Sequence, residues 1–202
     1  MTASRIARSP HSVPRFVGIS LEMTSYEKNT MNAPWTSNLF LKINALIGKW
    51  PLVDRIMMWS SQYLIWILLL FLVYSWWSAG FFIVWCTVFF VIALCSFSVS
   101  YLIAWLFPHP RPIRQFQNIH VLIHTWGTWK SFPSDHALGA TLLAYGALLT
   151  LTGPIRSIVM VCAVLVAVSR VWVGVHYPRD IIAGIVVGST MALVIQQMLF
   201  MG

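Results

Sequence analysis

The chain contains two long stretches without a charged side chain. No Asp, Glu, Lys or Arg occurs between Trp59 and Phe107, or between Ile181 and Gly202. About 20 helical residues cross the ~30 Å hydrocarbon core of a bilayer, so apolar runs of this length are typical of membrane spans. Only 9% of the whole chain is charged, against roughly a quarter in globular domains. These features exclude a soluble enzyme, a disordered tail and a nucleic-acid-binding module, and they predict an all-α, polytopic transmembrane helical bundle.

Turn residues divide the apolar sequence into about five predicted spans, and six are possible. The five spans are expected at 59–77, 81–107, 135–153, 155–172 and 179–202. Leu39 to Ile47 is too short to span, and it predicts an interfacial helix before the spans. We expect residues 1–34, which are polar and basic, to form a poorly ordered N-terminal segment that precedes a membrane domain over residues 35–202.

The number of spans has a consequence for topology. Five spans place the loops 108–133 and 174–178 on one membrane surface, together with the N-terminal segment, and the turns at 78–80 and 153–155 on the other. The two loops carry most of the ionisable residues outside the N-terminal region. Ionisable side chains near lipid are costly and indicate function. We therefore expect a site at one surface, where it can reach lipid headgroups.

Three short clusters at the ends of the spans carry the candidate residues. FPHPRP ends the second span, FPSDH begins the third, and SRVWVGVHYPRD joins the fourth to the fifth. Taken singly, each ionisable residue has an ordinary structural explanation, because a His at a helix end is usually interfacial and an Asp there is a favourable charge. Their joint spacing points to a shared site made of Arg111, His136, Arg170, His176 and Asp180.

The clusters resemble the three signatures of the type 2 phosphatidic acid phosphatase superfamily, KxxxxxxRP, PSxH and SRxxxxxHxxxD. Arg111 and Pro112 match the first, residues 133–136 the second and residues 169–180 the third. Within that superfamily the chain is most similar to the bacterial undecaprenyl diphosphate phosphatases, and the resemblance covers the chain from about residue 59 onward. Ala104 stands where the first signature has Lys. The site therefore has one positive charge fewer, unless His109 or Lys130 supplies it.

The resemblance implies a role for each catalytic side chain. His176 is the nucleophile and forms a phosphohistidine intermediate. Asp180, one helical turn on, fixes the tautomer of that ring. His136 protonates the leaving oxygen and then activates water. Arg111 and Arg170 bind the phosphate oxygens and offset charge in the transition state, so that neither metal nor cofactor is implied.

Further residues are expected to assist in phosphate binding. Ser134 begins a helix and can donate its hydroxyl where the free N–H groups face an anion. His109 is a second candidate. Asp135 either caps that helix or raises the pKa of His136, and capping is the favoured interpretation.

Other conspicuous residues are given structural interpretations. Three cysteines lie inside apolar runs and predict neither disulfides nor metal binding. His120 and His124 are a weak signal for metal, because no Cys or carboxylate accompanies them. Gly184 and Gly188 form a GxxxG pattern that predicts close helix packing.

The predicted function is hydrolysis of undecaprenyl diphosphate, a polyprenyl diphosphate lipid, to recycle a carrier for cell-wall synthesis. Alternatives are a phosphatase for phosphatidylglycerol phosphate, phosphatidic acid or lipid A 1-phosphate, a lipid phosphotransferase, and a scaffold that binds headgroups without catalysis. Membrane lipids are the other expected partners, nucleic acid is not, and the oligomeric state is open.

The orientation in the membrane has two conflicting indications. Counting Lys and Arg puts the N-terminal face in the cytoplasm. The resemblance implies a bacterial cytoplasmic membrane with the site on its outer, periplasmic face, and we adopt that orientation as the expectation.

Overall fold

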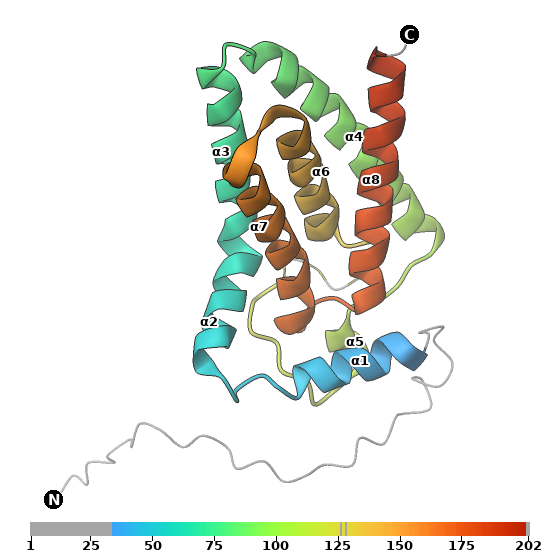
Figure 1. Ribbon diagram of the computed structural model, residues 1–202. Helices are drawn as coiled ribbons and strands as arrows, with labels where there is room; N and C mark the ends of the chain where they lie inside the picture. The colour runs from blue at the N-terminus through green and yellow to red at the C-terminus, as the bar shows by residue number, and fades with distance from the viewer. Residues whose placement is uncertain (1–33, 126, 128, 201–202) are drawn as a thin grey trace, which may run out of the picture. The chain divides into compact units, whose positions relative to one another are not determined.

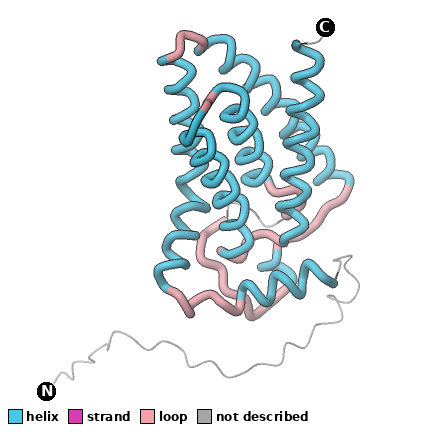
Figure 2. Tube along the Cα trace, viewed as in Figure 1, coloured by secondary structure: helices cyan, strands magenta, loops and turns pink. Residues whose placement is uncertain are grey.

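The computed structural model describes residues 34–125, 127 and 129–200. The predicted N-terminal segment over 1–34 therefore lies outside the described residues, apart from its last position. Helices joined by tight turns and one long loop make up the described part of the chain (Figures 1 and 2). In order they are α1 (Pro34–Asn44), α2 (Pro51–Trp59), the π-helix η1 (Ser60–Leu64), α3 (Ile65–Ser78), α4 (Phe82–Leu106), α5 (Pro112–Gln115), α6 (Asp135–Thr150), α7 (Gly153–Trp172) and α8 (Pro178–Phe200).

Four helices in the described region are long and apolar enough to cross a membrane. They are Pro51–Ser78, which joins α2, η1 and α3, and then Phe82–Leu106, Gly153–Trp172 and Pro178–Met198. The all-α, polytopic bundle is thus confirmed, and the chain is a multi-pass membrane protein. The structure differs from the expected five spans at α6, which has 16 residues where 135–153 was predicted.

The position of α6 explains why it can be short. It packs against α3, α4, α7 and α8, and Ala137, Leu138 and Ala147 on it are fully buried. A helix that is enclosed by other helices contacts protein and not lipid, so its length does not have to match the thickness of the hydrocarbon core.

Small residues allow α8 to approach α6 closely. A Cβ added to Gly184 would lie 2.6 Å from the carbonyl oxygen of Ser134, and one added to Gly188 would lie 3.2 Å from that of Leu138. Neither backbone could accept such a contact without moving. The close packing predicted from the GxxxG pattern is confirmed, and it holds the first turn of α6 against α8.

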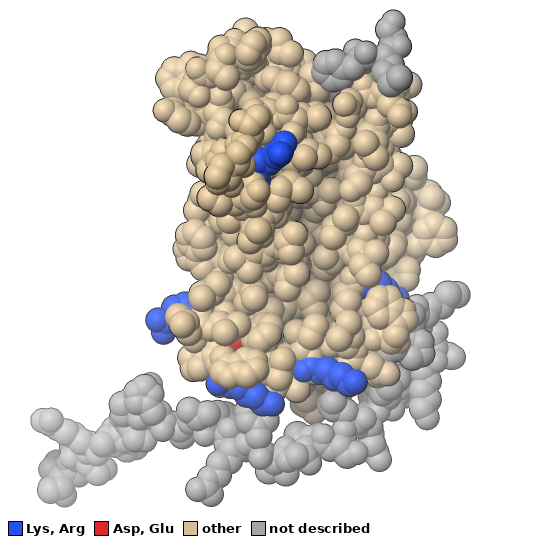
Figure 3. Space-filling view, viewed as in Figure 1, with Lys and Arg blue, Asp and Glu red and all other residues tan. Residues whose placement is uncertain are grey.

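The loops that carry the candidate residues lie at one end of the bundle, where α1 also lies. The turns between α3 and α4 and between α6 and α7 lie at the opposite end (Figure 1), as the topology predicts. On the face seen in Figure 3, Lys and Arg gather mainly at the α1 end, and the sides of the helices are largely free of charge.

Helix α1 holds the long loop between α4 and α6 in place. The Asn44 amide donates from Nδ2 to the carbonyl of His120 at 2.7 Å, and its Oδ1 accepts from the His120 N–H at 2.9 Å. Phe40, fully buried, packs edge-on to Tyr177 with ring centroids 5.3 Å apart. The Leu122 N–H donates to the Val173 carbonyl at 3.1 Å. These contacts fix the loop against the α7–α8 connection, where the candidate histidine lies.

Candidate active site

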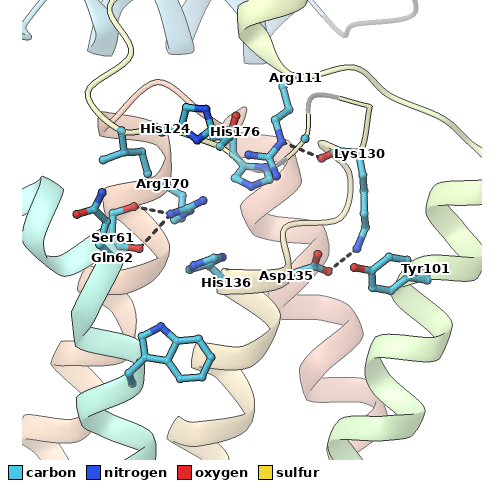
Figure 4. Close-up of a pocket in the computed structure, with 14 residues that line it drawn as sticks. Ser61, Gln62, Tyr101, Arg111, His124, Lys130, Asp135, His136, Arg170 and His176 are labelled. Atoms are coloured by element: carbon cyan, nitrogen blue, oxygen red, sulfur yellow. Dashed lines mark hydrogen bonds and ion pairs between the residues drawn. The ribbon is translucent and has the colours of Figure 1, made fainter.

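A cavity of about 480 Å³ opens at this end of the bundle, between residues that are far apart in the sequence. Its walls come from η1, the start of α3, α4, the long loop, the first turn of α6, the last turn of α7 and the α7–α8 connection (Figure 4). The lining residues are Ser61, Gln62, Trp66, Tyr101, Arg111, Ile123, His124, Thr125, Gly127, Lys130, Asp135, His136, Arg170 and His176.

His176 and Asp180 form a buried pair on one side of the cavity. The His176 Nδ1 lies 3.5 Å from the Asp180 Oδ2, and the two side chains are 3% and 0% exposed. This separation is longer than a well-formed hydrogen bond, as is common for catalytic contacts before substrate binds. Burial lowers the pKa of His176, and the nearby Asp180 carboxylate opposes that shift in part. The ring is therefore held in its neutral form with Nδ1 towards the carboxylate.

The carboxylate of Asp180 is itself fixed by other contacts. Its Oδ2 accepts from the Ser131 hydroxyl at 2.5 Å and from the Tyr177 N–H at 2.9 Å. The chain reaches this arrangement through Gly174, which has a φ of +85°. A Cβ there would lie 2.2 Å from the His120 carbonyl oxygen, so a side chain cannot replace it without displacing the loop.

His136 lies in the first turn of α6 and faces the same cavity (Figure 4). Arg170, His176 and Arg111 lie near enough to act on its ring electrostatically. The Ser134 hydroxyl caps this helix by accepting from the Ala137 N–H at 3.4 Å, and the Ser134 N–H donates to the Asp180 carbonyl at 3.0 Å. The cap therefore joins the position of His136 to that of the His176–Asp180 pair.

Two arginines face the cavity, Arg111 half-buried and Arg170 buried, and each is tethered through one nitrogen. The Arg111 Nε donates to the Lys130 carbonyl at 3.0 Å, while its buried Nη1 has no partner among the described residues. The Arg170 Nη1 donates to the carbonyl and the hydroxyl of Ser61 at 3.0 and 2.6 Å. Burial lowers the pKa of Arg111, against the attraction of Asp135 and Asp180, but a guanidinium remains charged at neutral pH. Each arginine therefore keeps donors for an anion.

A lysine from the long loop lies on the other side of the cavity. The Lys130 ammonium is ion-paired with the Asp135 carboxylate, lies 3.1 Å from the Ser100 hydroxyl and sits 3.9 Å above the centre of the Tyr101 ring. Ala104, where a signature lysine was expected, is buried one helical turn beyond Ser100. A cation from the loop thus reaches the segment of α4 from which that lysine is missing.

The structure corrects the favoured interpretation of Asp135. Ser134 caps α6, and the Asp135 carboxylate instead accepts from the Ser100 hydroxyl at 3.2 Å and pairs with Lys130. A buried ammonium nearby is a stronger partner for a carboxylate than backbone N–H groups that a serine already satisfies.

The predicted site residues are not all brought into the cavity. Five of them line it: Arg111, Asp135, His136, Arg170 and His176. Asp180 lies behind His176. Ser134 and His109 do not line the cavity, because Ser134 is the helix cap and the His109 ring packs against Phe132 with its Nδ1 2.8 Å from the Phe107 carbonyl oxygen.

Sequence reasoning missed the wall formed by η1, α3 and α4. Ser61 and Gln62 are polar residues at the start of an otherwise apolar span, and that contrast is a signal that could have found them. His124 lines the cavity, but His120 does not. Within the described ranges, no group of three His, Cys, Asp or Glu side chains is placed to hold a metal ion.

Comparison with known proteins gives a family match over most of the helical region. The model of the PAP2 superfamily matches residues 84–201. A putative undecaprenyl-diphosphatase of Escherichia coli (strain K12) is 38% identical over 93 residues, 46% of each chain. An undecaprenyl-diphosphatase of Sulfolobus acidocaldarius is 42% identical over 101 residues, 50% of this chain and 47% of the relative. This chain thus spans about half the length of these curated relatives.

The fold is also similar to that of a solved structure. The transmembrane PAP2 type phosphatidylglycerolphosphate phosphatase of Bacillus subtilis superposes with a TM-score of 0.56 at 21% identity, over 83% of this chain and 88% of that one. At this identity the likeness concerns the fold alone.

Proposed function

This chain belongs to the PAP2 superfamily, and we propose that it is an integral membrane phosphatase that hydrolyses undecaprenyl diphosphate to undecaprenyl phosphate and inorganic phosphate. The observation that carries the proposal is the buried His176–Asp180 pair, which shares one cavity with His136 and two tethered arginines. Headgroup binding alone would not require an oriented, neutral imidazole, so a scaffold without catalysis is disfavoured.

In the first step, the Nε2 of His176 attacks the terminal phosphorus of the lipid. The bond from that phosphorus to the bridging oxygen breaks, and His136 donates a proton to the departing oxygen. Asp180 keeps the proton of the His176 ring on Nδ1, so that Nε2 holds the lone pair. Arg111 and Arg170 offset the charge that collects on the equatorial oxygens.

In the second step, His136 accepts a proton from a water molecule as that water attacks the phosphohistidine. The P–N bond breaks, inorganic phosphate leaves, and both histidines return to their starting protonation states. A phosphotransferase would follow the same course with a lipid hydroxyl or phosphate in place of water.

Two features favour a diphosphate lipid as the substrate. Three cations line the cavity, Arg111, Arg170 and Lys130, against the single carboxylate of Asp135, and this balance suits a multiply charged anion. Trp66, Tyr101 and Ile123 add an apolar wall for the first prenyl units. The relatives named undecaprenyl-diphosphatases support the same choice.

The proposed cellular role is recycling of the carrier lipid for cell-wall synthesis. We place the protein in a bacterial cytoplasmic membrane with the cavity on the outer face. The alternative substrates are phosphatidylglycerol phosphate, phosphatidic acid and lipid A 1-phosphate.

The test is phosphate release by detergent-purified protein from undecaprenyl diphosphate, with phosphatidylglycerol phosphate, phosphatidic acid and a lipid A 1-phosphate in parallel. We expect release in the presence of EDTA, fastest from the prenyl diphosphate, and none from His176→Ala. Arg156→Gln, in α7 at the opposite end of the bundle, is the matched control and should keep full activity. Faster release from another lipid would contradict the substrate assignment, and release by His176→Ala would contradict the mechanism.

A further inference from the structure

The first long helix changes its winding at the level of the cavity. Between α2 and α3, residues Ser60–Leu64 form the π-helix η1, and Ser61 and Gln62 from this turn line the cavity. Single π turns inside α-helices are rare, and they occur frequently at functional sites. The α-helical register is broken here, so a side chain from elsewhere can bond to the helix backbone.

Arg170 makes that bond. Its Nη1 donates to both the carbonyl oxygen and the hydroxyl of Ser61, at 3.0 and 2.6 Å, across 109 positions of sequence. Figure 4 shows the two bonds running from the end of the Arg170 side chain to η1. Ser61 is fully buried and Arg170 is 5% exposed, so water does not compete strongly for these contacts.

The two bonds decide which edge of the guanidinium remains available. Nη1 carries two N–H groups, and Ser61 accepts from both. The Nε and Nη2 donors lie on the other edge, and Nε is buried without a hydrogen-bond partner among the described residues. That edge presents two parallel N–H groups, which is the geometry that binds a phosphate through two oxygens.

The tether also preserves the charge of Arg170. Within the described part of the chain, no carboxylate pairs with this guanidinium, and the acceptors at Ser61 are neutral oxygens. Lys130, by contrast, is paired with Asp135. A buried cation held by neutral groups keeps its full attraction for an anion that enters the cavity.

We infer that Ser61 is a positioning residue: the π turn at η1 aims the Nε–Nη2 edge of Arg170 at the phosphoryl group during its transfer. Ser61 acts through Arg170 and need not touch the substrate. The inference deepens the proposed function and rests on it for the identity of the reaction.

The first test is Ser61→Ala, which removes the hydroxyl and leaves the backbone carbonyl in place. We expect kcat/KM for the lipid to fall about tenfold or more, mostly through kcat, because misplacing a transition-state contact lowers the rate more than it lowers binding. Ser60→Ala is the matched control, since Ser60 is buried in the same π turn but does not line the cavity. An equal loss in both variants would contradict the inference.

A double-mutant cycle with Arg170→Lys separates positioning from a structural role. A lysine cannot form the two-nitrogen edge. In a protein that carries Arg170→Lys, Ser61→Ala should therefore lower kcat/KM little further, so the two losses should be strongly non-additive. Single-turnover phosphate release with excess enzyme gives the rates of these slow variants. Additive losses, or a fall in melting temperature that accounts for the whole loss, would overturn the inference.

A binding measurement keeps this test distinct from that of the proposed function. Inorganic phosphate should raise the apparent melting temperature of the wild type and of Ser60→Ala, and it should do so less for Ser61→Ala at the same concentration. If the wild type releases no phosphate from any lipid, the proposed function fails while this result still supports the anion-binding edge. Equal stabilisation of all three proteins, or of none, would contradict the inference.

Discussion

The two sides of the cavity hold their charges in different ways. On one side, His176 is oriented by Asp180, which lies behind it, and Arg170 is oriented by Ser61, which lies beside it, so that both keep their reactive edges facing the cavity. On the other side, Lys130 and Asp135 both line the cavity and neutralise each other there. The first side is ready for an anion as it stands. The second side must exchange a carboxylate for a phosphate before its cation can contribute, which makes it the side suited to selecting among substrates.

The largest effect should come from breaking the ready side. Asp180→Asn keeps the shape of the side chain but removes the charge that fixes the His176 tautomer, and we expect kcat to fall roughly 10³- to 10⁴-fold, by analogy with an orienting carboxylate in a catalytic triad. Phosphate release from the lipid measures it. A loss of less than tenfold would mean that the orientation of His176 comes from elsewhere.

Changing the charge of the neutralised side should have an intermediate effect and should show in KM. Lys130→Met leaves Asp135 unpaired in the cavity, so KM for a diphosphate lipid should rise about tenfold, whereas Asp135→Asn should lower KM severalfold. The variant with both changes restores the charge balance and should return towards the wild-type KM. If both single changes raise KM, the pair serves mainly to hold the loop against α4.

The pH dependence of kcat/KM tests the ready side through the direction in which its acid limb shifts when Asp180 is changed. The nucleophile must be neutral, and burial lowers the pKa of His176 below its ordinary 6.5, so on the acid side of the pH profile activity should be lost only once the pH falls below that value. Asp180 opposes the effect of burial by raising this pKa. In Asp180→Asn the acid limb of kcat/KM should therefore move to lower pH, even though the plateau is reduced. A limb that moves to higher pH would contradict the assignment of the nucleophile.

The smallest effect should come from His109, which was expected to bind substrate but lies outside the cavity, against Phe132. His109→Ala should change kcat/KM by no more than about twofold, since a residue without contact to substrate or catalytic groups contributes only through packing. Steady-state kinetics of His109→Ala, measured in parallel with Lys130→Met, give this change. A tenfold loss of kcat/KM would indicate that His109, and not Lys130, supplies the positive charge that is missing at Ala104.

Sequence reasoning reached the ready side because much of it is encoded locally. Four positions separate His176 from Asp180, so the short bend before α8, which begins at Pro178, brings them together, and uncharged runs of more than twenty residues indicate spans in any context. The contacts that tether Arg170 to Ser61 and Lys130 to Ser100 cross 109 and 30 positions. Periodicity and spacing carry no information about such pairs.

The remaining differences between the sequence-based predictions and the structure arise where several residues compete for the same interaction. Ser134 and Asp135 are both good helix caps, and the choice between them depends on Lys130, which the fold brings to Asp135 and not to Ser134. The length of α6 depends in the same way on neighbours that surround it. Hydropathy alone cannot distinguish a helix that faces lipid from one enclosed by other helices.

The two hydrogen bonds between Asn44 and His120 affect which parts of the long loop can change in sequence during evolution. One side-chain amide takes the place of a neighbouring strand at a single residue, and it holds the middle of the long loop in place. The half before it packs on the helices, where Phe116 stacks on Phe40, while the half after it contributes Ile123, His124 and Thr125 to the cavity. This cavity-lining stretch is held at one end by Asn44 and at the other by the bond from the Arg111 Nε to the Lys130 carbonyl, so substitutions at these three positions can accumulate while its ends stay in place. New substrate preferences can arise there while the proposed catalytic residues keep their positions.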